Sequence, residues 1–127
     1  MAPDENLRPY QPILGKQILL GVSGGIAAYK AADLASMLVQ LGADVHVLMS
    51  RSAQEFVGPA TFAALTLNPV HSDVLETWRG EFTGHISLGQ SADVFVIAPA
   101  TANTIAKLAA GLADDMIGAT ALTCTAS

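Results

Sequence analysis

The sequence predicts an α/β domain with a doubly wound parallel sheet, in which helices cover both faces of the strands to give three αβα layers. Short apolar runs alternate along the chain with segments in which apolar residues recur every three or four positions. The short runs are typical of strands buried on both faces, and the recurring pattern is typical of amphipathic helices. Strands that alternate with helices in this way pair in parallel.

The first strand–helix–strand unit is the clearest part of the chain. Residues 17–22 form an apolar run that ends at a Ser-Gly-Gly turn over residues 23–25, as expected for a buried strand. Residues 26–41 place their apolar side chains on one stripe, and Gly42 suits the end of that helix. Residues 43–49 form the second strand, which should lie parallel to the first through a right-handed crossover.

The rest of the chain continues the alternation. Residues 93–98 form its clearest strand, and their apolar character predicts a position in the centre of the sheet. The helix that follows carries one apolar stripe, which predicts a buried face. That stripe consists of Ile105, Leu108, Ala109 and Leu112. The other expected elements are a helical turn at 52–56, a helix at 59–67 ending at Asn68-Pro69, a short strand at 70–75, a loop at 81–84, a short helix carrying His85 and Leu88, and a last helix at 116–122 with Asp114 as its cap.

Composition narrows the class of protein. The 127 residues have room for one domain, which we expect over residues 16–127 after a polar tail over residues 1–15. Only 13% of the residues are charged and 51% are hydrophobic, so part of the apolar surface should be covered by other subunits or by a further part of the protein. The net charge of −5 argues against binding to nucleic acid.

Cysteine and hydropathy place the chain in a reducing, cytoplasmic setting. Cys124 is the only cysteine, so an intramolecular disulfide is excluded, and no Cys/His group has the spacing of a zinc site. We therefore expect no metal. No apolar run approaches the ~18 residues that a membrane span needs, which argues against a membrane protein.

Three polar loops are expected at one edge of the sheet, because ligands of parallel sheets bind outside the carboxyl ends of the strands. The loops are residues 23–25, residues 50–52 and residues 99–104, and each combines glycine or hydroxyl groups with the start of a helix. Glycine lets the backbone approach a ligand closely, and a helix N-terminus attracts an anion. Together the loops indicate a ligand that carries phosphate.

A mononucleotide such as FMN fits these loops better than a dinucleotide. The first loop matches neither G-x-G-x-x-G nor a Walker A loop. The second strand ends at Met49-Ser50, where an NAD-binding domain usually offers an acid to the ribose. Two structural alternatives stay open on these residues alone: a simple tight turn at 23–25, and helix capping by Thr101 or Asn103.

Other candidate residues also have competing interpretations. Residues 21–25 match the G-x-S-x-G motif of serine hydrolases, but only a polar tail precedes their strand, whereas that motif follows much of a sheet. Histidine suits proton transfer near neutral pH, although a lone histidine such as His85 is more often an ordinary surface or core histidine. Asp114 and Asp115 indicate helix capping more than a catalytic carboxylate pair. We interpret the remaining histidines and the tryptophan as structural: His46, His71 and Trp78.

Three segments together resemble the flavin-dependent cysteine decarboxylases. They are GVSGGIAAYK after the first strand, GHISL before the strand at 93–98, and APATANTIAKLAAGLADDM after that strand. Within this family the segments are most similar to the phosphopantothenoylcysteine decarboxylases of coenzyme A biosynthesis. The resemblance runs from about Lys16 to Ser127.

The resemblance implies a Rossmann-like, flavodoxin-like fold that binds FMN and decarboxylates 4′-phosphopantothenoylcysteine to 4′-phosphopantetheine. It identifies His85 with the essential histidine of the family. It also implies a homo-oligomer, either a trimer or a dodecamer. The residues it places at or near the cofactor are Ser23, Gly24, Gly25, Ser50, Ser52, Thr101, Ala102, Asn103 and Thr104.

Family members continue with another strand, a P-x-M-N motif for the substrate carboxylate and a flap with a proton-donating cysteine. The chain has none of these, so we expect the domain to be incomplete at its C-terminus and inactive in isolation, with Cys124 outside the flap role. Two alternatives remain: a non-catalytic flavin-binding subunit, and another enzyme on the same scaffold, such as a flavin prenyltransferase.

Overall fold

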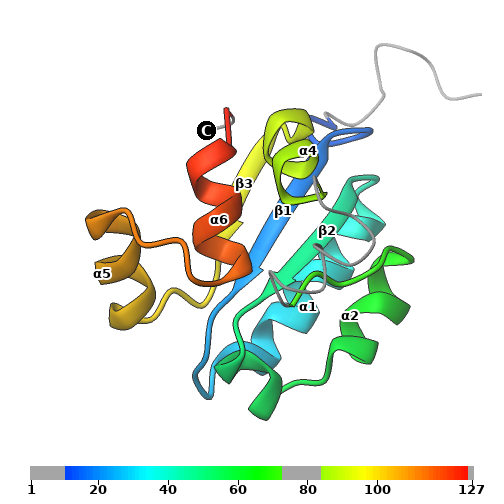
Figure 1. Ribbon diagram of the computed structural model, residues 1–127. Coiled ribbons are helices and arrows are strands. Elements are labelled where there is room, and N and C mark those ends of the chain that lie inside the picture. Colours follow the sequence, from blue (N-terminus) through cyan, green and yellow to red (C-terminus); the bar gives the residue numbers. More distant parts are fainter. Residues whose placement is uncertain (1–10, 73–83, 126–127) are drawn as a thin grey trace, which may run out of the picture.

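The computed structural model describes residues 11–72 and 84–125, apart from the side chains of residues 84–87. Its centre is a parallel sheet of three strands, β1 (Gln17–Val22), β2 (Asp44–Met49) and β3 (Val94–Ile97). The strand order is β2-β1-β3, so β1 lies in the middle (Figure 1). The predicted doubly wound parallel sheet is confirmed, and β1 has the bounds that its apolar run predicts.

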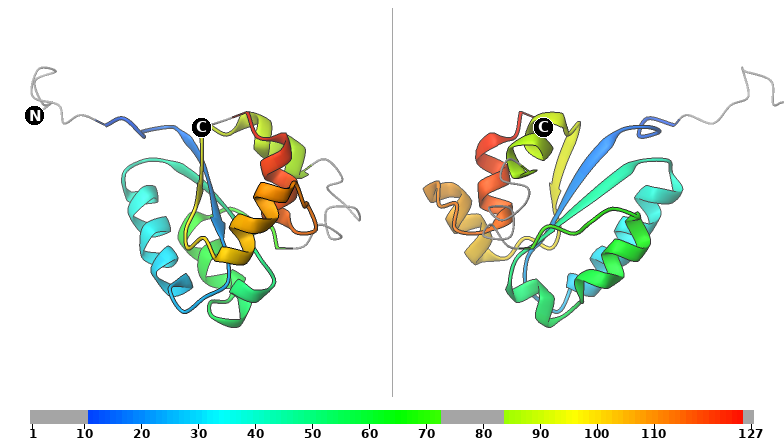
Figure 2. Two further views of the ribbon diagram at one scale, coloured as in Figure 1. Left: turned by 90° about the vertical axis from the view of Figure 1, so that its left-hand side faces the viewer. Right: turned by 45° about the vertical axis from the view of Figure 1, so that its right-hand side comes forward.

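Helices cover both faces of the sheet. On one face lie α1 (Ala28–Gln40) and α2 (Pro59–Thr66), and on the other lie α4 (Gly84–Ser91) and α6 (Met116–Thr123) (Figure 2). A short 3-10 helix, η2 (Ser52–Glu55), follows β2. The last helix, α5 (Ala102–Ala110), lies beside α6 and away from the centre of the sheet.

Two apolar clusters hold these layers together, one on each face of the sheet. The larger lies between the sheet and helices α1 and α2, and it includes the fully buried Leu20 and Phe62. The smaller cluster lies between the sheet and α6. It includes Leu48, Met116 and Ile117, with Phe95 and Ile97 packed against it. Val47 and Met49 of β2 belong to the larger cluster, whereas Leu48 between them belongs to the smaller one. This is the alternation of side chains expected along a strand.

The second part of the chain is less covered than its apolar character predicts. Of the described strands, β3 pairs with β1 alone, so they include one of the two neighbours that a central strand needs. The apolar stripe of α5 is not buried, since Ile105 is 56% exposed and Leu112 is 54% exposed. An apolar pattern shows which face favours burial, but it does not supply a partner for that face. Lastly, Asp115 caps α6 and Asp114 does not, because the Asp115 carboxylate accepts the Gly118 N–H at 2.8 Å.

The segment between α2 and α4 is described only in part. Where a strand was expected at 70–75, His71 forms an isolated parallel bridge with Leu48, and no described residue extends it into a strand. Residues 73–83, which include Trp78 and most of the loop expected at 81–84, lie outside the described residues. Gly84 is the first residue of α4 and not the end of that loop.

Candidate functional site

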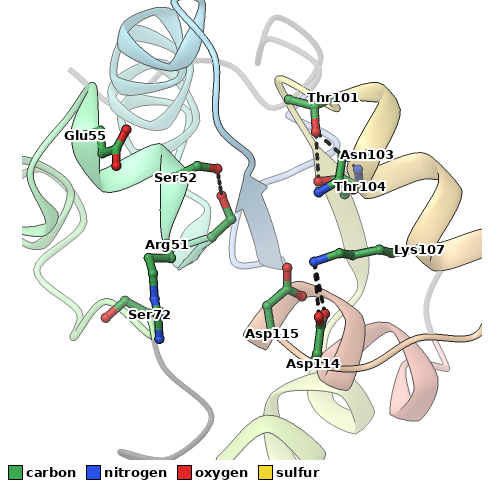
Figure 3. Close-up of a pocket in the computed structure, with 11 residues that line it drawn as sticks. Arg51, Ser52, Glu55, Ser72, Thr101, Asn103, Thr104, Lys107, Asp114 and Asp115 are labelled. Carbon is green, nitrogen blue, oxygen red and sulfur yellow. Dashed lines mark hydrogen bonds and ion pairs between the residues drawn. The ribbon is translucent and has the colours of Figure 1, made fainter.

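A polar cavity of about 430 Å³ lies at the carboxyl edge of the sheet, where the chain leaves β2 and β3 (Figure 3). Its volume is within the usual range for sites that bind small molecules. The loop after β2 lines one side, and α5 with the start of α6 lines the other. The lining residues are Ser50, Arg51, Ser52, Glu55, Ser72, Thr101, Asn103, Thr104, Lys107, Asp114 and Asp115.

The loop after β2 presents two hydroxyl groups to this cavity. The Ser50 and Ser52 hydroxyls share one hydrogen bond at 3.2 Å, and the Ser50 oxygen also accepts the Ala53 N–H at 3.2 Å. Whichever serine donates in the shared bond, the hydrogen of the other hydroxyl is left over, because each hydroxyl carries one hydrogen. The pair therefore has one donor to offer to a bound ligand.

The start of α5 supplies the groups on the opposite side. Thr101 is the N-cap of this helix, since its side-chain oxygen accepts the Thr104 N–H at 3.2 Å. The Thr101 hydroxyl donates to the Thr104 hydroxyl at 3.1 Å, which leaves the Thr104 hydrogen free for another acceptor. The Asn103 side chain is exposed and brings both a donor and an acceptor to the cavity. Capping and ligand contact are thus compatible at this helix end.

Charges of both signs line the cavity. Lys107 contacts both carboxylate oxygens of Asp114 at 3.2 Å, and Asp115 is engaged as the cap of α6. Arg51 has no ion pair with any described residue. Its guanidinium extends toward Ser72 on the same side of the cavity (Figure 3) and is the cationic group most available to an anion such as a phosphate.

The first glycine loop, residues 23–25, is not part of the cavity lining. A side-chain carbon at Gly24 would come within 2.2 Å of the Ser52 hydroxyl, so only glycine lets the two loops approach this closely. Gly25 has a φ of +147°, which side chains rarely tolerate. The Ser23 side chain is fully buried, and its hydroxyl donates to the Pro99 carbonyl and accepts the Thr101 N–H at 2.9 Å. The first glycine loop therefore connects the loop after β2 with the segment that leads from β3 into α5.

This geometry also bears on the hydrolase alternative. A nucleophilic serine must expose its oxygen to substrate, whereas the Ser23 hydroxyl is 0% exposed and engaged in two hydrogen bonds. The match of residues 21–25 to G-x-S-x-G is therefore a coincidence of a strand-to-helix turn. Among the described residues, no group of three His, Cys, Asp or Glu side chains is arranged to hold a metal ion.

The structure places the predicted ligand residues in two groups. Five of them line the cavity: Ser50, Ser52, Thr101, Asn103 and Thr104. Four do not: Ser23, Gly24, Gly25 and Ala102. The backbone of His85 lies in the first turn of α4, a helix that packs against α6, and its side chain is outside the described part of the structure.

Sequence reasoning missed most of the charged residues of the cavity. Arg51 stands between two predicted ligand serines, so the loop itself was a sufficient signal. Lys107 lies four residues after Asn103 and therefore on the same face of α5. Glu55, Ser72, Asp114 and Asp115 reach the cavity only through the tertiary fold.

Within the described residues, no helix is long and apolar enough to cross a membrane.

Comparisons with known proteins agree with this architecture. The chain is 50% identical over 107 residues to a probable phosphopantothenoylcysteine decarboxylase of Streptococcus mutans, which covers 84% of this chain and 60% of that protein. It is 50% identical over 111 residues to the coenzyme A biosynthesis bifunctional protein CoaBC of Bacillus subtilis, covering 87% of this chain and 27% of that protein. The chain thus spans less than two thirds of the length of either relative.

Among solved structures, the fold superposes with a TM-score of 0.80 on TvaF, an FMN-dependent cysteine decarboxylase from thioviridamide biosynthesis. The two are 25% identical, and the match covers 87% of this chain and 68% of TvaF. This similarity agrees with the Rossmann-like, flavodoxin-like fold that the sequence predicts. Residues 7–127 match the Flavoprotein family, nearly the whole of the chain. The chain therefore belongs to the Flavoprotein family.

Proposed function

We propose that the chain forms the FMN-binding part of an enzyme that removes CO₂ from 4′-phosphopantothenoylcysteine and yields 4′-phosphopantetheine, a step of coenzyme A biosynthesis. The observation that carries this proposal is the cavity at the carboxyl edge, where hydroxyl groups, an amide and an arginine converge, the arginine having no ion pair with residues 11–72 or 88–125. The proposal is supported by relatives at 50% identity that are named for this reaction or this pathway. The domain responsible is residues 16–127, preceded by a polar segment over residues 1–15.

The residues of the cavity fit the chemical groups of FMN. A phosphate needs hydrogen-bond donors and positive charge, and these come from Arg51 and from the spare hydroxyl hydrogen of Ser50 and Ser52. The polar edge of a flavin ring needs both donors and acceptors, and these come from Asn103 and Thr104. We therefore assign the phosphate to the loop after β2 and the ring to the start of α5.

FMN bound there would supply a reversible two-electron oxidation of the substrate cysteine, which makes loss of its carboxylate favourable. The chain's own residues bind and orient the reactants, and we assign proton transfer to His85. This assignment rests on the GHISL segment and on the place of His85 at the start of α4, next to the helix whose cap lines the cavity. Histidine changes its charge near neutral pH, which suits an acid–base role.

The test begins with purified protein. Flavin absorbance that is released as FMN on denaturation supports the cofactor assignment, and tightly bound NAD or FAD would contradict it. Asn103→Ala should weaken FMN binding roughly 2- to 13-fold, because a hydrogen bond between neutral groups is worth about 0.5–1.5 kcal/mol. Gln40→Ala is the matched control, since Gln40 is exposed at the end of α1 and lies outside the cavity.

Activity is tested with phosphopantothenoylcysteine as substrate, by measuring release of CO₂ and formation of 4′-phosphopantetheine. The assay should use the natural protein that contains this chain. FMN binding without decarboxylation would instead support a non-catalytic flavin-binding subunit.

We also propose that the protein is a homo-oligomer of the cytoplasm, a trimer or a dodecamer. Large apolar side chains without cover support this proposal, among them Ile26, which is 80% exposed, and Tyr29, which is 55% exposed. Such surface is typical of subunit contacts. Light scattering coupled to size exclusion gives the oligomeric state, and a monomer at micromolar concentration would contradict the proposal.

A further inference from the structure

Ser23 is bonded to the segment that leads from β3 into α5. Its N–H donates to the Pro99 carbonyl at 3.2 Å, its hydroxyl donates to the same carbonyl, and its hydroxyl oxygen accepts the Thr101 N–H at 2.9 Å. The side chain is 0% exposed. A serine hydroxyl has one hydrogen, and here that hydrogen is used inside the protein. The Ser23 hydroxyl therefore has no hydrogen to donate to a cofactor.

The residue that Ser23 holds controls the direction of α5. Thr101 is the N-cap of this helix, and its carbonyl also accepts the Ile105 N–H at 3.0 Å. Further along, α5 is held only by a limited contact with α6 and by the partly exposed ion pair between Lys107 and Asp114. Thr104 is its only buried residue, and the face that carries Ile105 is exposed. The orientation of α5 thus depends mainly on its first turn.

That first turn carries the groups on one side of the cavity. Asn103 and Thr104 are two and three residues from the Thr101 N–H that Ser23 accepts, and Lys107 is one turn further. A change at Thr101 would tilt all of these groups together. Ligand groups have to be held to within about half an ångström of their productive position, so a small tilt is costly.

From this geometry we infer that Ser23 is a positioning residue, which sets the orientation of α5 toward the cavity and acts on the cofactor through Thr101. It is not itself a ligand through its hydroxyl. The inference rests on the proposed function for the identity of the cofactor, whereas the link from Ser23 to α5 is a property of the protein alone. The two are therefore separable by experiment.

The first test needs no cofactor. In Ser23→Ala the Thr101 N–H loses its acceptor, so amide hydrogen exchange in a peptide covering residues 99–110 of the apo-protein should accelerate on the order of 10-fold. A peptide covering residues 17–22 should change far less. Ile18→Val is the control, because Ile18 is buried near the far end of the same strand. Equal acceleration at 99–110 in both variants would overturn the inference.

The second test measures FMN affinity in a double-mutant cycle. Ser23→Ala should weaken binding on the order of 10-fold and shift the visible absorption or circular dichroism of bound flavin, whereas Ile18→Val should leave both unchanged. The effects of Ser23→Ala and Asn103→Ala should be less than additive, because both act through α5. The effects of Ser23→Ala and Arg51→Ala on the free energy of FMN binding should be additive, because Arg51 lies on the loop after β2 and not on α5. Additivity in both pairs, or FMN affinity unchanged in Ser23→Ala, would overturn the positioning role. A wild-type protein that binds no FMN would refute the proposed function instead, and the exchange experiment would still decide the link to α5.

Discussion

The first half of the fold, residues 17–66, and the second half, residues 94–123, follow similar sequence patterns but differ in how well they are covered. Residues of β1 from Ile18 to Val22 are almost wholly inaccessible, whereas each residue of β3 keeps part of its surface exposed. The helix stripes differ in the same way. Ala35 on α1 is 0% exposed, and Ile105 on α5 is 56% exposed.

The difference shows that the first half carries most of the buried core, whereas the cavity draws both on the loop after β2 and on the less covered second half. The central strand has a neighbour on both sides and helices over both faces, so its burial is complete. The edge strand has one neighbour among the described strands, and the helix after it has little to pack against. That second half supplies Thr101, Asn103, Thr104 and Lys107 to the cavity. Elements with few buried contacts are often the ones that bind ligands.

The largest expected effect tests the stability side of the comparison. Leu20→Ala in the centre of β1 should lower the free energy of unfolding by about 2–5 kcal/mol, because the side chain is fully buried and leaves a cavity. Ile105→Ala on the exposed face of α5 should change it by no more than about 0.5 kcal/mol. Urea denaturation of the apo-protein measures both. Similar losses at the two positions would show that α5 is covered in solution.

A second prediction tests the functional side. His85→Asn should keep the fold and the flavin, because we assign its side chain to proton transfer and not to the core. Decarboxylation should fall by at least the ~10²-fold typical of a lost acid–base group. Circular dichroism and flavin content are the controls, measured beside turnover in the natural protein. Near-normal turnover would mean that His85 is structural.

A third prediction compares two buried threonines, one in each half. The Thr66 hydroxyl donates to the Phe62 carbonyl at 2.8 Å and accepts the Asn68 N–H at 3.2 Å. Thr66→Val should therefore cost about 1–3 kcal/mol, since the Asn68 N–H loses its acceptor. The Thr120 hydroxyl is buried in α6 and has no hydrogen-bond partner within the part of the chain that the structure describes. Thr120→Val keeps its shape and should leave stability unchanged or raise it by up to about 1 kcal/mol. The change in thermal midpoint distinguishes the two, and a clear loss in Thr120→Val would reveal a partner, such as a buried water.

The smallest effect concerns pH and lies in the first half. The hydrogen bond from the Asn68 amide at 2.9 Å lowers the pKa of Asp44 below its ordinary value of 3.8. Burial opposes this lowering, and the interaction with His46 at 3.1 Å adds to it. A lowered pKa contributes stability above the unfolded value, and this contribution is lost as pH falls through the folded pKa. Because the Asp44 side chain is 56% exposed, the contribution should not exceed about 1 kcal/mol.

Asp44→Asn isolates this contribution. The variant should be less stable than the wild type at pH 6, and the gap should narrow as pH falls below about 4, as measured by denaturation at each pH. Ser36→Ala on the outer face of α1 is a control that should show no such narrowing. A gap that stays constant down to pH 2.5 would assign the loss to packing and not to the carboxylate.

Much of the fold was predictable because it depends on local chemistry. The apolar run at 17–22, the amphipathic stripe of α1 and the threonine before α5 each specify a strand, a helix or a cap through their own side chains and near neighbours. Five of the predicted ligand residues line the cavity for a related reason. In a parallel sheet the carboxyl ends of the strands share one edge, so polar residues after each strand come together without any knowledge of contacts.

What the sequence determined by itself was therefore the identity and order of the elements and the edge of the sheet where the cavity lies. Only the tertiary structure decided that β1 pairs with both β2 and β3, that Asp115 caps α6 while Asp114 pairs with Lys107, and that the Ser23 hydroxyl turns inward to Pro99 and Thr101. The physical reason is the same in each case. An apolar run, a carboxylate or a hydroxyl has several acceptable partners, and the choice among them depends on which groups far away in the chain are brought within hydrogen-bond or packing distance.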